Sequence, residues 1–400
     1  MASIHAALGM LSFGTVLACS GSAEVHSVGA GETPEARVEV AAEWPLFRGD
    51  PGQRGIAAGS LPDELGVLWS FDAGAAITSS PVISGGRVYF GADDSKLHAL
   101  DFASGEELWA FATEDMIEAP PLVQGGRVFV GSSDFFLYAV DAESGVLRWK
   151  AETDDRILGG ANRVRGPAGQ SWIVVGSYDT QLYCFDAESG ERQWTYKTDN
   201  YVNGTPAVFD DRIVFGGCDA VLHVVDARTG EASEKIEIGE GCHIAGSVAV
   251  ADGKAYFGHY GNAFVRVDLE SGAIDWSYGD GQNPFFSSPA VGTERVVFGG
   301  RDKALHCVRR DDGGELWSFP TRRKVDGSPV ICGGKVVFGS GDGWLYVLDL
   351  ESGRELWSYE TGQAIFSSPA VAGGVIVVGS NDGRLYAFGL DRLKVSDIDK

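Results

Sequence analysis

An aspartate recurs about once every 40 residues along most of the chain. Carboxylates are ligands that Ca²⁺ prefers and can act as general acids or bases, so the series could indicate a metal site or a catalytic group. Its uniform repetition favours a structural role instead. Asp side chains accept hydrogen bonds from backbone N–H groups in tight turns, and we predict that the series caps one repeated turn. Its members are Asp94, Asp134, Asp179, Asp219, Asp302, Asp342 and Asp382.

The cysteines and His243 show no spacing that is typical of a metal site. Beyond the N-terminal region the chain has no CxxC pair and no adjacent cysteines. Neither a zinc site nor a dense disulfide framework is therefore indicated. His243 has no second ligand in the sequence, and we interpret it as a loop residue. The cysteines concerned are Cys184, Cys218, Cys242, Cys307 and Cys332.

The remaining cysteine, Cys19, follows the longest apolar run of the chain. Residues 6–18 are too few for the roughly 20 that span a bilayer, and they suit the core of a signal peptide. The tetrapeptide VLAC resembles the lipobox of bacterial lipoproteins, which predicts that Cys19 is acylated; an ordinary secretory signal or an incidental cysteine are the alternatives. We assign residues 1–19 to the signal peptide and residues 20–43, rich in Gly, Ala, Ser and Glu, to a flexible tether.

The overall charge excludes several classes of partner. The chain carries 56 acidic and 32 basic residues, for a formal net charge of −24, which repels phosphate backbones and anionic lipid headgroups. Nucleic acid is therefore not expected as a partner.

Arg322, Arg323 and Lys324 form a basic cluster in this acidic chain. We interpret it as a docking point for an acidic loop of a partner, with a merely solvated run as the alternative.

All these residues must be positioned by a repeat of about 40 residues, visible in several columns at once. A Trp marks seven copies and Glu234 stands where an eighth is expected, with successive spacings of 40 to 45 residues. Each copy contains four short runs rich in Val, Ile, Tyr, Phe and Trp, which predicts four strands, here called A to D in chain order. We expect the tryptophans to be structural. They are Trp69, Trp109, Trp149, Trp194, Trp276, Trp317 and Trp357.

Eight such copies predict an all-β protein, an eight-bladed β-propeller of four-stranded antiparallel blades. Radial packing supplies each sheet with a neighbour on both apolar faces. The blade that begins at Glu234 should be the weakest. Because a D-like strand at 67–72 precedes any A strand and the last copy ends after its C strand, the N-terminal strand is predicted to complete the last blade. We assign 65–390 to the propeller, 44–64 to a lead-in and 391–400 to a tail.

Function is expected where the copies differ. The A–B and C–D turns are nearly uniform, whereas the D–A and B–C loops differ in every blade and share one face, around the mouth of the channel. Aromatic and charged side chains there suit a protein surface or an extended peptide, although half of the rings could instead plug the mouth as core. The candidate partner-binding residues are Met116, Ile117, Glu118, Arg156, Tyr201, Asn203, Phe285, Phe286, Arg322, Arg323, Lys324 and Phe366, joined by Phe135, Phe136, Tyr178, Tyr260 and Trp344 from the B–C turns.

The third copy departs from the others in its A strand. Asn162, Arg163 and Arg165 replace the usual small and apolar residues on or near this inner strand. Arginines that face the channel would need carboxylate partners, and Glu118 and Asp326 are available.

The repeat resembles the pyrroloquinoline-quinone-type propeller repeat, most clearly in GSGDGWLYVLDLESGRELW and GSNDGRLYAFG, and WPLFRGDPGQRG is similar to the lead-in of such propellers in bacterial exported proteins. The layout of lipobox, tether and eight blades is similar to that of the propeller lipoprotein family of the outer-membrane β-barrel assembly machinery. The resemblance implies an exported, monomeric, non-catalytic scaffold without a cofactor. It would lie in the periplasm or at the cell surface, anchored to the outer membrane by a lipid, and would bind other cell-envelope proteins.

The same resemblance leaves a second function open. Quinone-dependent dehydrogenases of alcohols or sugars share the repeat and hold a quinone and a calcium ion in the channel. Methanol-type members also stack the quinone on two adjacent cysteines. The sequence contains no such pair and no evident cluster of Glu, Asn and Asp on adjacent inner strands, so the scaffold is the preferred interpretation.

Overall fold

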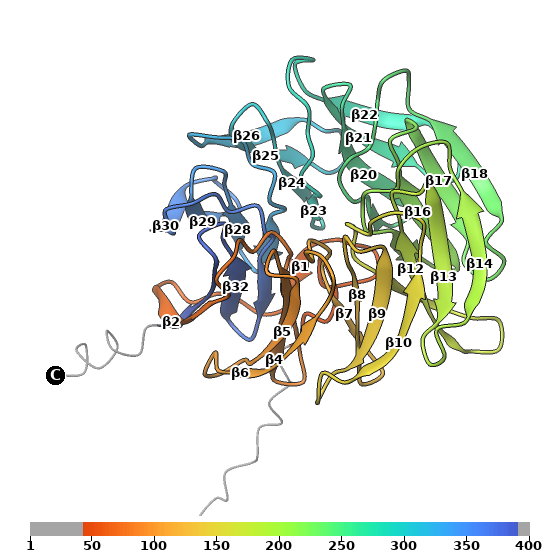
Figure 1. Cartoon of the computed structure of the whole chain (residues 1–400). Helices are drawn as coiled ribbons and strands as arrows, with labels where there is room; N and C mark the ends of the chain where they lie inside the picture. The colour runs from red at the N-terminus through yellow and green to blue at the C-terminus, as the bar shows by residue number, and fades with distance from the viewer. Residues whose placement is uncertain (1–42, 391–400) are drawn as a thin grey trace, which may run out of the picture. The chain divides into compact units, whose positions relative to one another are not determined.

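The computed structural model describes residues 43–390, which form eight antiparallel sheets arranged in a ring (Figure 1). The fold is the predicted eight-bladed β-propeller. The described residues contain no helix, and hence none that could cross a membrane. Cys19, the predicted signal peptide, nearly all of the predicted tether and the predicted tail at 391–400 lie outside the described residues.

Each blade is a four-stranded sheet that runs from an inner A strand to an outer D strand. Blades 1 to 4 consist of β3 (Val82–Ser84), β4 (Arg87–Ala92), β5 (Lys96–Asp101) and β6 (Glu107–Ala112); β7 (Leu122–Gln124), β8 (Arg127–Gly131), β9 (Phe136–Asp141) and β10 (Leu147–Glu152); β11 (Asn162–Arg165), β12 (Ser171–Gly176), β13 (Gln181–Asp186) and β14 (Arg192–Lys197); and β15 (Ala207–Phe209), β16 (Arg212–Gly216), β17 (Val221–Asp226) and β18 (Ala232–Glu237).

Blades 5 to 8 repeat the arrangement, with the N-terminal β1 and β2 added to the last two. They consist of β19 (Ala249–Ala251), β20 (Lys254–His259), β21 (Ala263–Asp268) and β22 (Ile274–Tyr278); β23 (Ala290–Val291), β24 (Arg295–Gly299), β25 (Ala304–Arg309) and β26 (Glu315–Pro320); β27 (Val330–Cys332), β28 (Lys335–Gly339), β29 (Trp344–Asp349) and β30 (Glu355–Glu360), with β1 (Ile56–Ala57) beside β27; and β31 (Ala370–Ala372), β32 (Val375–Gly379), β33 (Arg384–Leu390) and β2 (Leu65–Asp72).

Burial follows the position of a strand within its blade. The B and C strands of blade 1, β4 and β5, are buried over four or five successive residues, as expected for strands covered on both faces. The D strand β6 alternates between exposed and partly buried side chains. Apolar clusters therefore lie between neighbouring blades; one of them joins Leu182 of blade 3 to Phe215 of blade 4.

The tryptophans lie on the D strands, between successive blades. The indole Nε1 of Trp109 donates a hydrogen bond to Ala142 O of the next blade at 3.3 Å. A glycine of the same turn lies against the ring, since a Cβ built on Gly145 would come within 2.7 Å of it. Trp69, Trp149, Trp194, Trp276, Trp317 and Trp357 donate in the same way to Phe102, Ala187, Ala227, Arg310, Leu350 and Leu65.

Glu234 interrupts this column on β18, where blade 4 meets blade 5. The glycine of the next C–D turn, Gly272, faces only side-chain atoms of Ile236, the nearest 3.6 Å from a Cβ built there. The turn thus lacks both the ring and the indole hydrogen bond that the other junctions have. The low stability of this part of the ring stays a prediction, with this missing contact as its physical cause.

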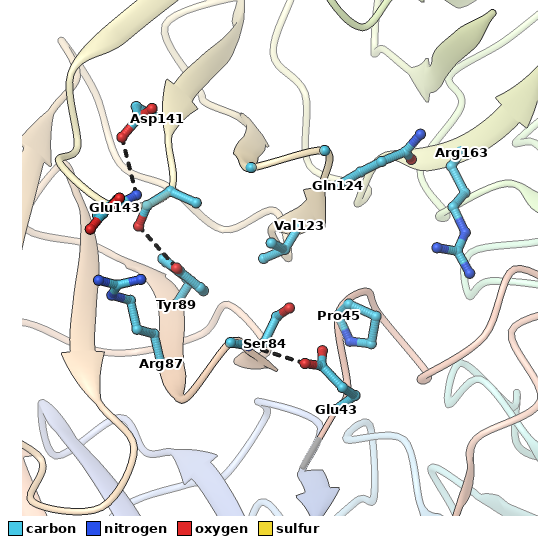
Figure 2. Close-up of a pocket in the computed structure, with 14 residues that line it drawn as sticks. Glu43, Pro45, Ser84, Arg87, Tyr89, Val123, Gln124, Asp141, Glu143 and Arg163 are labelled. Atoms are coloured by element: carbon cyan, nitrogen blue, oxygen red, sulfur yellow. Dashed lines mark hydrogen bonds between the residues drawn. The ribbon is translucent and has the colours of Figure 1, made fainter. Parts of the chain in front are cut away.

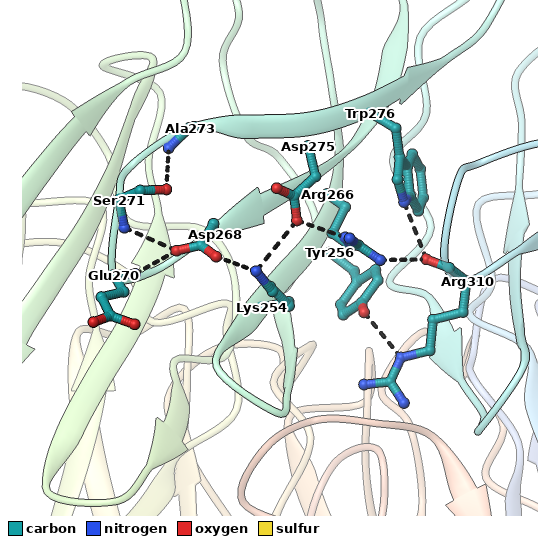
Figure 3. Close-up of polar contacts among 10 residues, drawn as sticks. All are labelled: Lys254, Tyr256, Arg266, Asp268, Glu270, Ser271, Ala273, Asp275, Trp276 and Arg310. Carbon is teal, nitrogen blue, oxygen red and sulfur yellow. Dashed lines mark hydrogen bonds and ion pairs between the residues drawn. The ribbon is translucent and has the colours of Figure 1, made fainter.

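The other side of blade 5 is joined to blade 6 by a polar network (Figure 3). Arg310 O accepts hydrogen bonds from Arg266 Nη1 at 2.6 Å and from the Trp276 indole at 3.0 Å. Arg310 Nε in turn donates to the Tyr256 hydroxyl at 2.9 Å, and Arg266 pairs with Asp275 at 2.8 Å. These bonds add a polar link between blades 5 and 6 to the indole hydrogen bond of Trp276.

The N-terminal strand closes the ring, as predicted. β2 pairs antiparallel with β33 from Leu65, opposite Leu390, to Asp72, opposite Arg384. An ion pair of 2.7 Å joins Arg384 and Asp72 at the end of this ladder. Blade 8 thus combines strands from both ends of the propeller, which removes two exposed sheet edges.

The lead-in crosses the ends of the A strands next to the A–B turns, opposite the mouth (Figure 1). Trp44 bridges Ile83 of blade 1. Carbonyls of the following residues then accept hydrogen bonds from A strands of blades 2, 4, 5, 6 and 7 at 2.7 to 3.0 Å. The donors are the backbone N–H groups of Val123, Val208, Val250, Val291 and Ile331.

Arg48 of the lead-in is fully buried inside the ring. Its guanidinium donates hydrogen bonds to the carbonyls of Pro289, at 2.9 Å, and Pro329, on blades 6 and 7. Burial lowers the pKa of Arg48 to about 9, an effect that Asp50 partly offsets. The side chain thus ties the lead-in to the far side of the ring.

The predicted capping role of the aspartate series is confirmed. Asp179 Oδ1 accepts a hydrogen bond from Gln181 N at 2.9 Å, and its Oδ2 accepts one from the Tyr183 hydroxyl at 2.7 Å. Blade 5 has Gly261 at this position and lacks the aspartate cap; the ring of His259 accepts a hydrogen bond from Gly261 N at 3.0 Å, as Ser177 Oγ does from Asp179 N in blade 3. The aspartates therefore shape the B–C turns of the mouth.

Candidate binding face at the channel mouth

Each D–A loop sends one apolar side chain inward, and two predicted partner-binding residues are of this kind. Ile117 and Phe285 are 0% and 3% exposed, so the prediction that they lie open at the mouth is wrong. A Cβ built on Gly91 would lie 2.1 Å from Ile117, and one on Gly258 2.4 Å from Phe285, so a glycine at the end of each B strand makes room for them. The buried column consists of Ile77, Ile117, Ile157, Val202, Ile244, Phe285, Val325 and Ile365.

Neighbouring residues of the same loops are at the surface. Met116 and Tyr201 are 36% and 45% exposed, and the B–C turns add Phe135 at 43% and Tyr260 at 47%. Arg156 is exposed as well. Several other predicted side chains, those of Glu118, Asn203, Phe286 and Phe366, are half-buried. The mouth therefore contains both an apolar plug and an exposed rim.

A first run of stacked side chains crosses blades 3 and 4. The Arg156 guanidinium lies 4.7 Å from the centre of the Tyr178 ring. Tyr178 stacks on Tyr201 of the next D–A loop at 4.8 Å. Beside them, the half-buried Asn203 donates from Nδ2 to Cys218 Sγ at 3.1 Å. One face of Tyr201 thus remains open to a partner.

A second run continues over blades 5 and 6. The rings of His243 and Tyr260 meet edge-on at 5.9 Å, and Tyr260 lies 4.4 Å from Phe286. The Arg301 guanidinium covers Phe286 at 3.8 Å, and Lys324 of the next loop lies 5.0 Å from the Phe366 ring. We call the two runs together the mouth belt: Arg156, Tyr178, Tyr201, His243, Tyr260, Phe286, Arg301, Lys324 and Phe366.

The belt ends in a hollow of about 370 Å³ between blades 6, 7 and 8. The predicted basic cluster is only partly there: Arg323 and Lys324 line the hollow, whereas Arg322 does not and donates its backbone N–H to Asp342 at 2.9 Å. Two further cations, from the B–C turn of blade 6, were missed because they are remote in sequence. The lining residues of this basic hollow are Arg301, Lys303, Arg323, Lys324, Gly341, Ala364 and Phe366.

The rim at blades 1 and 2 carries carboxyl groups instead. Burial, and next the charge of Asp93, raise the pKa of Glu118, while Arg156 acts in the opposite direction. Burial likewise raises the pKa of Asp93, whose Oδ1 accepts a hydrogen bond from the Thr78 hydroxyl at 3.3 Å. The mouth is therefore acidic on one side and basic on the other.

The polar residues of the third A strand do not face this mouth. Asn162 is buried and donates to the carbonyls of Pro51, at 2.8 Å, and Pro206, so it serves the lead-in. Arg163 and Arg165 are exposed and form no ion pair with Glu118 or Asp326; Asp326 pairs instead with Arg301 and Lys324. The proposed pairing is wrong because alternate residues of β11 point outward near the A–B turn.

Arg163 lies instead at the edge of a hollow on the opposite face, where the lead-in meets blades 1 to 3 (Figure 2). Glu43 Oε1 accepts a hydrogen bond from Gly85 N at 3.1 Å there, and the Tyr89 hydroxyl donates to Ala142 O at 3.0 Å. The Glu43 contact fixes the start of the lead-in, and the Tyr89 contact joins blade 1 to blade 2.

The quinone and calcium that the repeat implies can be tested against the side chains present. Within residues 43–390, no three His, Cys, Asp or Glu side chains converge in a way that could hold a metal ion. The turn aspartates are occupied by backbone and Tyr or His partners, as at Asp179. Opposite the mouth, Leu46 and Arg48 are buried inside the ring. This part of the chain does not fit a calcium–quinone pair.

Comparison with solved structures gives the same fold. BamB from Moraxella catarrhalis matches with a TM-score of 0.68 and 20% identity, over 82% of this chain and 100% of its own. A quinohemoprotein alcohol dehydrogenase from Pseudomonas putida HK5 matches with a TM-score of 0.74 and 14% identity, over 87% and 80%. A europium-containing methanol dehydrogenase matches with a TM-score of 0.72 and 13% identity, over 87% and 98%.

No curated protein matches the sequence. The protein family described as outer membrane protein assembly factor BamB matches residues 63–167, 157–279 and 301–394, which together cover most of the chain and all or part of each blade. The repeat columns, the eight blades and this match agree, and the chain belongs to the BamB family.

Proposed function

We propose that this protein is a non-catalytic, exported scaffold that binds other cell-envelope proteins through the mouth belt and takes part in outer-membrane protein assembly. Membership of the BamB family supports an exported protein associated with the outer membrane. In this proposal the protein acts as a monomer, and acylation of Cys19 is its only attachment to the membrane.

The observation that carries the proposal is the exposure of large rings in the mouth belt. Tyr201 and Tyr260 are 45% and 47% exposed, yet each is fixed by a neighbouring ring. Rigid aromatic side chains of this kind contribute contact area at low cost in side-chain entropy, and Tyr and Arg are enriched among residues that dominate binding energy. The belt thus has the composition of a protein-binding surface.

Site-specific photocrosslinking tests this proposal. A photoreactive amino acid replaces Tyr201 or Tyr260 in the full-length protein, and crosslinks are collected in intact cells. Leu108 and Ile274, equally exposed on outer D strands, are the matched control positions. We expect discrete protein adducts from the two tyrosine positions and none from the controls. Equal labelling at all four positions, or none at the mouth, would overturn the proposal.

The alternative function, that of a quinone-dependent dehydrogenase, is tested on the purified full-length protein. It is incubated with pyrroloquinoline quinone and Ca²⁺, and reduction of a dye is followed over a panel of alcohols and sugars. The proposed scaffold gives no dye reduction above the protein-free control, whereas turnover that depends on both additives would contradict it.

A further inference from the structure

The basic hollow is formed by loops far apart in the sequence. Arg301 and Lys303 come from the B–C turn of blade 6, Arg323 and Lys324 from the D–A loop before blade 7, and Phe366 from the loop before blade 8. No carboxylate belongs to its lining. In a chain with a formal net charge of −24, the hollow gathers four cations around one aromatic ring.

Within residues 43–390, only two of these cations have a carboxylate partner. Asp326, 18% exposed at its side chain, accepts hydrogen bonds from Arg301 Nε and Nη2, each at 3.1 Å, and pairs with Lys324 at 2.5 Å. Lys303 and Arg323 are exposed, and among the described residues no carboxylate lies within 4.0 Å of their charged groups. The hollow therefore keeps two uncompensated positive charges beside a fixed pair.

The hollow also has an apolar wall. Lys324 lies over Phe366 at 5.0 Å, and Arg301 lies over Phe286 at 3.8 Å, which connects the hollow to Tyr260 in the mouth belt. The hollow suits a ligand that combines an anionic group with an apolar one. Because the wall continues into the exposed belt, the ligand also has room to extend along the surface.

We propose that the basic hollow binds an acidic segment of a partner protein, with a carboxylate between Lys303 and Arg323 and a neighbouring apolar side chain against Phe366. This inference rests on the proposed function, because it names the chemistry of the partner that the mouth belt holds. Charge complementarity selects this partner: the rest of the molecule is acidic and repels such a segment.

A random heptapeptide display library, selected on the full-length protein, is the probe. We expect Asp or Glu next to an apolar residue to be enriched in the selected peptides. For one such peptide, labelled and measured by fluorescence anisotropy, Arg323→Glu should weaken binding about fivefold and Lys303→Glu with Arg323→Glu about tenfold or more. High salt should weaken binding to the wild type and have little effect on the double variant.

Arg322→Glu is the matched control, since it reverses the adjacent exposed charge outside the hollow and should change binding by less than about twofold. Peptides without acidic enrichment, or equal effects at Arg322 and Arg323, would overturn the inference. If peptides bind and depend on Tyr260→Ser but not on these charges, the inference alone fails. If no peptide is selected and crosslinking at the mouth is also absent, the proposed function fails with it.

Discussion

At the scale of single residues, the mouth holds charged groups directly against aromatic rings. Arg156 on Tyr178 and Arg301 on Phe286 are contacts of 4.7 and 3.8 Å. Each such contact contributes about 0.5 to 2 kcal/mol, depending on how far water is removed. Glu118 shows the opposite effect: its partly buried carboxyl is harder to ionise than in water.

Glu118→Gln should therefore stabilise the protein at neutral pH. The folded-state pKa of Glu118 is raised above its unfolded value, so its ionisation destabilises the fold, and stability falls as the pH rises between the two values. We expect the variant to melt at a higher temperature than the wild type at pH 7 and at the same temperature below the unfolded pKa of about 4.3. Thermal melts between pH 4 and pH 8 measure this difference.

Glu270→Gln is the control for this experiment, because Glu270 is exposed and lies in the C–D turn of blade 5, away from the mouth. It should leave the pH dependence unchanged. A Glu118→Gln protein that is less stable than wild type at pH 7 would mean that the carboxylate makes a favourable contact outweighing its desolvation.

At the scale of the repeated elements, the D strand and the next C–D turn form one joint, repeated around the ring. Trp and Gly are the two halves of this joint, as Trp109 and Gly145 show. Half-buried indoles contribute through both buried area and the hydrogen bond to the next blade. Glu234 supplies neither at the junction of blades 4 and 5.

Glu234→Trp should restore the missing joint. The new indole would lie against Gly272, beside the Ile236 side chain, and could donate to Leu269 O, which has the position in blade 5 that Ala142 O has in blade 2. We expect a gain in the free energy of unfolding of about 1 to 3 kcal/mol. Chemical denaturation measures it, and Trp109→Glu, the reverse change at an intact joint, should lose a similar amount. No gain from Glu234→Trp would show that blade 5 has another support on this side.

The repeated strands and turns could be predicted from the sequence because each recurring residue type has the same structural role in each blade that has it. The Gly column at Gly91 and the apolar column at Ile117 are an example: both were visible, but only their contact in space shows that one makes room for the other. An alignment of the eight D–A loops shows an apolar residue at the same position in each, which would have assigned Ile117 and Phe285 to the core. The basic hollow could not be found this way, because Lys303 and Arg323 become neighbours only through the ring.

At the scale of the whole molecule, closure depends on β2, whose partner β33 lies at the other end of the chain. Inner strands contact their neighbours around the ring, from β3 and β7 to β31 and back to β3. The ladder of β2 is therefore the place where one broken sheet can open the whole assembly.

Ser70→Pro should destabilise the protein more than Ser318→Pro. Both serines are exposed, follow the column Trp and pair with the C strand at the same register, but Ser318 belongs to blade 6, which is continuous in the chain. We expect a loss of about 1 to 3 kcal/mol for Ser318→Pro and a larger loss for Ser70→Pro, measured by calorimetry. Deletion of residues 1–74 should act in the same direction. Equal losses for the two prolines would contradict the closure argument.

The lead-in also determines how the molecule carries tension. A pull at Glu43 first loads the contacts of Trp44 with blade 1 and then the hydrogen bonds to the following A strands, before it reaches β2. Arg48, buried against blades 6 and 7, must be drawn out of the ring on the way. The load thus enters at the inner A strands and is shared among several blades. The mouth belt, at the opposite ends of the A strands, is left free to hold a partner while the chain is under strain.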